Sequence, residues 1–231
     1  MHIQHVYAVY FSPTGNTRRI VCQGASEAAR LFQVPCRAIS LNLPKDREMV
    51  HTFSAGDLVI VGGPTYAGKL PNKILPTYQE KLIGKGALAL AVVTYGNRSF
   101  DNSLAELCAT LDGNGFRTVA AGAFVGPHAF SDVLAPDRPD KDDLALMVRL
   151  TDMAVSKIRQ TDGMVPRLVV DGDARAPYYV PKGVDGQPAK FLKAKPKTDL
   201  EKCVSCGLCA RQCPMGSIDP DQPSVVNGIC I

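Results

Sequence analysis

The sequence lacks the features of membrane-spanning and exported proteins. No apolar run reaches the roughly 20 residues that a helix needs to cross a bilayer, and Met1-His2-Ile3-Gln4 carries no charged region leading into a signal sequence. The 26 basic residues exceed the 22 acidic residues only slightly, which does not favour nucleic-acid binding. We therefore expect a cytoplasmic protein with no membrane span and no nucleic-acid partner.

A separate catalytic centre is also missing. The sequence offers no Ser/His/Asp or Cys/His set and no cluster of carboxylates, on which hydrolytic and acid–base enzymes depend. It has no internal repeat and no low-complexity tract. Any redox or group-transfer chemistry is therefore expected to come from a bound cofactor.

What is present is enough apolar sequence for one substantial core. The chain has 231 residues, of which 45% are hydrophobic, and near-continuous apolar runs suit strands buried on both faces of a parallel sheet. Segments with apolar residues at helical spacing alternate with these runs, so we predict an α/β fold with a doubly wound sheet. The predicted strands cover 6–11, 36–41, 58–61, 87–93 and 119–125, and the predicted helices cover 21–32, 104–111 and 144–158.

The chain divides into three parts by composition. Residues 1–160 carry the alternating pattern, whereas 161–197 contain five prolines and no sustained period. We interpret 161–197 as a connecting arm that lies on the first domain, and 198–231 as a small cysteine-rich domain. The expected anchors of the arm are Tyr178, Tyr179, Phe191 and Leu192.

A loop rich in hydroxyl groups follows the first predicted strand. Backbone N–H groups, hydroxyls and the positive end of a helix together favour an anion at such a place. Gly15 permits close approach of the backbone, and Asn16 tolerates a tight turn. The residues expected to bind the anion are Ser12, Thr14, Gly15, Asn16 and Thr17.

These residues resemble the phosphate loop of the flavodoxin family, over about residues 3–160. The resemblance implies a five-stranded parallel sheet in the order 2-1-3-4-5, with the loop holding the 5′-phosphate of FMN. The loop contributes no metal site, so its ligand should be a single phosphomonoester. The chain departs from many flavodoxins in having no tryptophan and in being mildly basic.

Two further loops leave the third and fourth predicted strands. Ligands of doubly wound sheets bind beyond the carboxyl ends of the strands, and in flavodoxin-like proteins the corresponding loops sandwich the flavin ring. Tyr66 and Tyr95 are therefore expected to flank a flat ring. The expected flavin-contacting residues are Pro64, Thr65, Tyr66, Ala67, Gly68, Thr94, Tyr95, Gly96, Asn97 and Phe100.

Other motifs in this region are less informative. No Gly-x-Gly-x-x-Gly follows the first strand, and Gly63–Lys69 matches Gly-x4-Gly-Lys but continues with Leu70 where a hydroxyl residue is needed. Arg98 either stabilises an anionic reduced flavin or caps a surface turn. His128 follows the fifth strand, where a single histidine is either structural or close to the site.

Five of the eight cysteines crowd the last 29 residues. Cys203, Cys206, Cys209 and Cys213 have the x2-x2-x3 spacing followed by proline, which is typical of bacterial ferredoxins with [4Fe–4S] clusters; zinc is the alternative. The resemblance is to proteins in which a flavodoxin domain is fused to a two-cluster ferredoxin. The other three cysteines, Cys22, Cys36 and Cys108, are expected to be small core residues.

In two-cluster ferredoxins the fourth cysteine of each run ligates the other cluster. Cys230 then begins a second run that the sequence does not complete, so we expect a chain truncated within a ferredoxin domain that holds two clusters when complete. Residues 203–231 either hold one cluster, with Cys213 or Cys230 as the fourth ligand, or hold none and pack as an ordered arm.

Three functions remain open from the sequence. The first is electron transfer between FMN and [4Fe–4S] clusters, with a redox protein as partner. The second is FMN-dependent reduction of a small acceptor, such as a quinone, a nitro compound or oxygen. The third is a redox-sensing module that acts through the lysines of 190–197; a homodimer is compatible with each.

Overall fold

The computed structural model describes residues 2–188 and 195–230. Its centre is a parallel five-stranded sheet in the order β2-β1-β4-β6-β7, which is the predicted order 2-1-3-4-5 and defines a flavodoxin-like doubly wound fold. The fold class predicted from the sequence is therefore confirmed. The strands are β1 (His5–Tyr10), β2 (Cys36–Ser40), β4 (Asp57–Pro64), β6 (Leu88–Tyr95) and β7 (Arg117–Val125).

Burial explains which strands the sequence predicts well. Every residue of β4 from Asp57 to Gly63 and every residue of β6 from Leu88 to Thr94 is buried, as expected for strands covered on both faces. By contrast, β2 forms one edge of the sheet and is mostly exposed. The prediction that Cys36 is a core residue is wrong, because this position opens the edge strand and is exposed.

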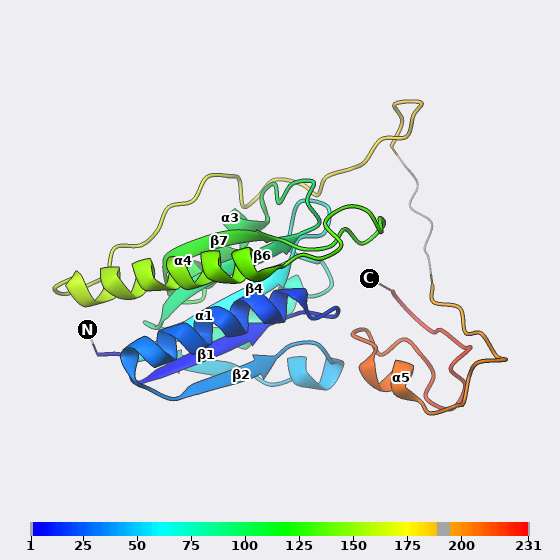
Figure 1. Ribbon diagram of the computed structural model, residues 1–231, viewed down its shortest axis with the longest axis horizontal. Helices are drawn as coiled ribbons and strands as arrows, with labels where there is room; N and C mark the ends of the chain where they lie inside the picture. Colours follow the sequence, from blue (N-terminus) through cyan, green and yellow to red (C-terminus); the bar gives the residue numbers. More distant parts are fainter. Residues whose placement is uncertain (1, 189–194, 231) are drawn as a thin grey trace.

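Helices cover both faces of the sheet (Figure 1). On one face, α1 (Asn16–Phe32) and α4 (Lys141–Gln160) pack side by side and share a core with β1, β4 and β6. On the other face lie α2 (Leu75–Lys81) and α3 (Ser103–Gly113). The sequence did not predict α2, a seven-residue helix too short for a clear helical period. No helix of the described residues is both long and apolar enough to span a membrane.

A second, smaller sheet was also not predicted. Strands β3 (His51–Ser54) and β5 (Leu82–Lys85) pair in parallel, and the 3-10 helix η1 (Pro44–Arg47) precedes them. Each strand has four residues, which is too few to separate a strand from a loop by alternation alone.

The segment that follows α4 runs back along the first domain, as the yellow trace in Figure 1 shows. The N–H of Leu168 donates to the carbonyl of Thr118 at 2.7 Å, and the Tyr178 hydroxyl donates to the carbonyl of Leu70 at 2.7 Å. Two of the expected anchors, Phe191 and Leu192, lie outside the described residues, as do Lys190 and Lys193. The division into three domains stays a prediction.

The cysteine-rich segment contains one short helix, α5 (Leu208–Gln212). It closes on itself through the N–H of Asn227, which donates to the carbonyl of Ser217 at 2.6 Å, and through the Ser217 hydroxyl, which donates to the carbonyl of Ile229 at 2.5 Å. In Figure 1 this segment lies beyond the arrowheads of β1 and β2. The cysteine-rich segment therefore lies at the carboxyl edge of the sheet.

Candidate functional site

The loop between β1 and α1 ends in a helix start at which the N-cap residue is a glycine. Gly15 takes a left-handed conformation with φ of 87°, and α1 begins at the next residue. Gly15, the N-cap residue, has no side chain to cap the helix, and the first turn of α1 carries no acidic residue. The first-turn N–H groups and the helix dipole are thus directed at a place suited to an anion.

Ser12 is buried and organises the phosphate loop from within. Its hydroxyl accepts the N–H of Arg18 at 3.0 Å, while its own N–H donates to the side-chain oxygen of Asn42 at 2.6 Å. The Asn42 amide donates in return to the Ser12 carbonyl at 3.1 Å. Sequence reasoning missed Asn42, although a polar residue directly after the second strand falls at the same carboxyl edge.

Three threonines connect the phosphate loop to the loops after β4 and β6. The hydroxyls of Thr17 and Thr94 are 2.6 Å apart and buried, and the N–H of Thr65 donates to the Thr94 carbonyl at 2.7 Å. The Thr65 hydroxyl shares a second hydrogen bond with Ser103, at 2.6 Å. The structure therefore brings the three predicted loops together. The Thr17 hydroxyl, which the sequence predicts as an anion ligand, is hydrogen-bonded to Thr94 within the protein.

Residues 66–69 form a tight two-residue turn. The N–H groups of Tyr66 and Lys69 each donate to the other residue's carbonyl, at 2.8 and 3.2 Å. Ala67 and Gly68, between them, both have positive φ, 49° and 79°, as a type I′ turn requires. The sequence predicts that the chain leaves the strand at Gly62. In the structure the loop starts later, because Gly62–Pro64 still pair with Val92–Thr94 in the sheet.

The loop after β6 is supported by aromatic and backbone contacts. Tyr95 and Phe100 meet edge to face at 5.4 Å, and the N–H of Gly126 donates to the Tyr95 carbonyl at 2.8 Å. A Cβ atom at Gly96 would lie 3.0 Å from the Cα of His128. His128 thus borders the predicted site, and Gly96 is the residue that permits this close approach.

Arg98 is held at the surface of this loop. Its guanidinium pairs with Asp101 and lies over the ring of Tyr179, 4.3 Å from the centroid. Of the two roles considered for Arg98, these contacts favour the capping of a surface turn.

A buried ion pair lies beneath the 66–69 turn. The Lys69 ammonium is 3.0 Å from the Glu106 carboxylate and donates to the carbonyls of Ala174 and Ala176 at 2.7 and 2.9 Å. Glu106 also accepts the N–H of Leu70 at 2.8 Å. The sequence associated Lys69 only with a coincidental phosphate-loop pattern, and the long-range partners that explain it have no local signal.

Tyr66 lies in the 66–69 turn and is largely shielded from water. Burial raises the pKa of the Tyr66 hydroxyl, and the negative charge of a Cys230 thiolate would raise that pKa further.

The five C-terminal cysteines are all free thiols. The backbone between the first three bends through left-handed conformations at Ser205 and Gly207, and the Cys213 sulfur accepts the N–H of Ser217 at 3.3 Å. Within the described part of the chain, no three Cys, His, Asp or Glu side chains are grouped closely enough to hold a metal ion. Metal ligation by Cys203, Cys206, Cys209, Cys213 and Cys230 stays a prediction.

The donor chemistry nevertheless fits an iron–sulfur cluster. Residues 203–213 contain four thiols and no carboxylate, and an all-thiolate set selects soft metals, iron–sulfur clusters or zinc. For FMN, the start of α1, whose N-cap residue has no side chain, and the open space around Gly15, where a Cβ would meet no atom within 4 Å, fit a phosphate group. The residues that fit the cluster and those that fit the phosphate are the ones that the sequence predicts as binding sites.

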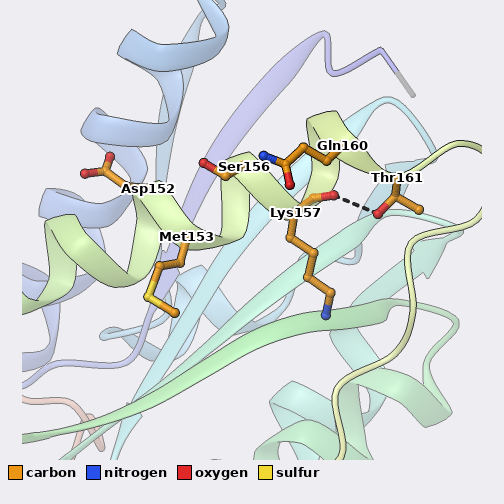
Figure 2. A pocket seen from close by; sticks show the side chains of 6 residues that line it. All are labelled: Asp152, Met153, Ser156, Lys157, Gln160 and Thr161. Carbon is orange, nitrogen blue, oxygen red and sulfur yellow. Dashed lines mark hydrogen bonds between the residues drawn. The ribbon is translucent and has the colours of Figure 1, made fainter.

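A hollow elsewhere on the molecule is unrelated to these residues (Figure 2). It lies along the second half of α4, where the side chain of Lys157 extends toward β7 and donates to the Val119 carbonyl at 3.1 Å. Because α4 runs back from the carboxyl end of β7, this hollow lies toward the opposite edge of the sheet. Its lining residues are Asp152, Met153, Ser156, Lys157, Gln160 and Thr161.

The sequence comparisons identify the second part of the chain. Residues 196–219 match a family model described as a 4Fe-4S binding domain, and this range includes Cys203, Cys206, Cys209 and Cys213. No curated protein matches the chain.

Comparison with solved structures finds, among others, two flavodoxins and an oxidoreductase, all three with TM-scores below 0.5. A flavodoxin of Streptococcus pneumoniae TIGR4 is 17% identical, with 66% of this chain and 99% of that chain covered and a TM-score of 0.47. Oxidised flavodoxin 2 of Bacillus cereus is 15% identical, with 67% and 99% covered and a TM-score of 0.46. Rubredoxin oxygen:oxidoreductase of Desulfovibrio gigas is 17% identical, with 68% and 37% covered and a TM-score of 0.45.

The fold class rests on the strand order rather than on these likenesses. A flavodoxin-like sheet in the order β2-β1-β4-β6-β7 is followed in one chain by a segment that matches a 4Fe-4S binding domain. The chain therefore joins a flavodoxin-like domain to a ferredoxin-type segment.

Proposed function

We propose that this protein is an electron-transfer flavoprotein that passes electrons between bound FMN and a [4Fe–4S] cluster. The observation that carries the proposal is the position of the cysteine-rich segment against the predicted flavin loops. Arg47, which is hydrogen-bonded to the carbonyl of Asn42 beside the phosphate loop, donates to the carbonyl of Pro214 at 2.7 Å, and Met215 packs against the core cluster that contains Phe11. Electron exchange requires such proximity between the two centres.

The proposed roles of the residues follow from their positions. The first-turn N–H groups of α1 other than that of Arg18, together with the hydroxyl of Thr14, would bind the phosphate, with Ser12 and Asn42 holding the loop in shape. Tyr66 and Tyr95 would limit access of water to the ring. Cys203, Cys206 and Cys209, with Cys213 or Cys230, would hold the cluster.

Bound FMN supplies the exchange between two-electron and one-electron chemistry, a property of the cofactor rather than of the protein. The chain binds and orients it and brings it close to the cluster. The proposed partner is a one-electron redox protein. The alternative, reduction of a small acceptor, differs in requiring turnover without any protein partner.

The test is anaerobic reconstitution of the protein with FMN, iron and sulfide. We expect an absorption spectrum with flavin bands and a broad iron–sulfur shoulder, and electrons added as dithionite should distribute between both centres. A protein that binds no flavin, or two centres that do not exchange electrons, would contradict the proposal. Steady reduction of a quinone without a protein partner would favour the small-acceptor alternative.

A further inference from the structure

Arg47 bridges the first domain and the cysteine-rich segment. It ends η1, and its guanidinium donates to the carbonyls of Leu41 and Asn42 at 2.9 and 2.7 Å. The other terminal nitrogen donates to the carbonyl of Pro214 at 2.7 Å. Since Pro214 follows Cys213 directly, this contact is one residue from a predicted cluster ligand.

The same arginine is connected to the phosphate loop. Asn42, whose carbonyl it holds, exchanges two hydrogen bonds with the backbone of Ser12. The guanidinium carbon also lies 5.9 Å from the ring centre of Phe11, which is the residue directly before Ser12. A continuous set of hydrogen bonds therefore runs from Ser12 through Asn42 and Arg47 to Pro214.

Packing beside Arg47 supports the same contact. Met215 packs against the core cluster that contains Phe11, and a Cβ atom at Gly216 would lie 3.3 Å from the Cγ of Pro44. Within the described residues no carboxylate forms an ion pair with Arg47. Its hydrogen-bonding capacity is instead directed at three carbonyls, which the planar fork of arginine can reach together and a lysine cannot.

We propose that Arg47 is a positioning residue that docks the cluster segment against the FMN phosphate loop and thereby sets the rate of electron exchange between the two centres. The inference rests on the proposed function. Each exchange moves one electron from the reduced cluster to the flavin, without making or breaking a bond. Two such transfers and two protons from water complete the reduction of FMN, and a one-electron protein donor supplies the electrons to the cluster.

The test compares Arg47→Gln and Arg47→Lys with the wild-type protein, each reconstituted anaerobically with FMN, iron and sulfide. Arg37→Gln is the matched control, because Arg37 is an exposed arginine on the edge strand β2, which precedes η1 in the chain. The first readout is hydrogen exchange of residues 208–217. Loss of one charge-assisted hydrogen bond should increase exchange there by roughly tenfold in Arg47→Gln, with a smaller increase in Arg47→Lys.

The second readout is the rate at which the flavin absorbance bleaches after dithionite reduces the cluster, measured per chain loaded with both centres. We expect this rate to fall by roughly tenfold in Arg47→Gln if one such bond controls docking, and to be unchanged in Arg37→Gln. FMN and iron contents should stay at the wild-type level in all variants.

The outcomes separate this inference from the proposed function. A wild-type protein that binds no flavin or no cluster defeats the proposed function itself. A wild-type protein that exchanges electrons, with Arg47→Gln unchanged in hydrogen exchange and in rate, overturns the role of Arg47. Loss of FMN or iron with an unchanged rate per loaded chain also overturns it, because Arg47 would then support binding rather than docking.

Discussion

At the scale of single residues, Gly15 shows how the candidate phosphate site depends on backbone conformation. Its φ of 87° lies in the left-handed region, which costs a residue with a Cβ about 1–2 kcal/mol. The space around it is open, with no atom within 4 Å of a Cβ. Conformation alone therefore accounts for the glycine at this position.

We expect Gly15→Ala to lower the free energy of unfolding by about 1 kcal/mol, because the substitution adds strain without a clash. Gly113→Ala is the control: it also meets no atom within 4 Å, but it lies in the last turn of α3 with ordinary φ. There alanine should stabilise by up to roughly 1 kcal/mol. Urea denaturation of both variants measures the difference, and equal effects would contradict the explanation.

Much of the candidate site was predictable residue by residue, but its supports were not. The Ser12–Thr17 motif carries a local signal that residue types and spacing reveal. Asn42, Ser103 and the Lys69–Glu106 pair act through partners 30 or more residues away in sequence, at 30, 38 and 37 positions of separation. Such contacts depend on the folded topology, so no local pattern predicts them.

At the scale of elements, the segment around residues 174–178 is attached to the first domain through Lys69. Lys69→Met would leave Glu106 buried without its cation, a loss of roughly 3–5 kcal/mol, and would free the carbonyls of Ala174 and Ala176. We expect lower stability in urea and faster proteolysis within 170–180. The double variant Lys69→Met/Glu106→Gln should recover part of the stability, and no recovery would contradict the pairing.

The start of α4 provides a second prediction, on pH dependence. Asp140 and Asp143 form a capping box, and the Arg138 guanidinium beside Asp143 holds the pKa of that carboxyl below its ordinary value. A carboxyl with a lowered folded-state pKa stabilises the fold above its unfolded pKa, about 3.9. This stability is lost as the pH falls through the folded-state pKa.

Asp143→Asn should therefore destabilise the protein at pH 7, by roughly 1–2 kcal/mol, and the difference from wild type should shrink as the pH falls below about 4. The exposed neighbour Asp142→Asn is the control and should have little effect. Urea denaturation at pH 7 and pH 3 measures both. A difference that is constant with pH would contradict the assignment to ionised Asp143.

Strands were predictable from the sequence where both of their faces are buried. Strands β4 and β6 are continuous apolar runs because both faces are covered, and this made them predictable. The edge strand β2, the four-residue strands β3 and β5, and α2 lack that signal. Cys36 illustrates the error, since its place in a strand was predicted but its exposure depends on which strand forms the edge.

At the scale of the whole molecule, cysteines are expected to bind iron only in the C-terminal part of the chain. Cys206→Ser should abolish or strongly reduce iron incorporation, because Cys206 belongs to the segment that matches a 4Fe-4S binding domain. Cys36→Ser is the control, because Cys36 is also exposed but lies outside that segment, and this variant should retain wild-type iron. Iron and sulfide analysis after anaerobic reconstitution measures both, and zinc in place of iron would contradict the cluster.

The contacts of residues 168–179 with the first domain have a consequence for how the two parts meet. Ala174, Ala176 and Tyr179 are hydrogen-bonded to the first domain near the carboxyl edge of the sheet, and the same chain then supplies Pro214, which Arg47 of that domain contacts. The encounter is intramolecular, so its extent should not change when the protein is diluted.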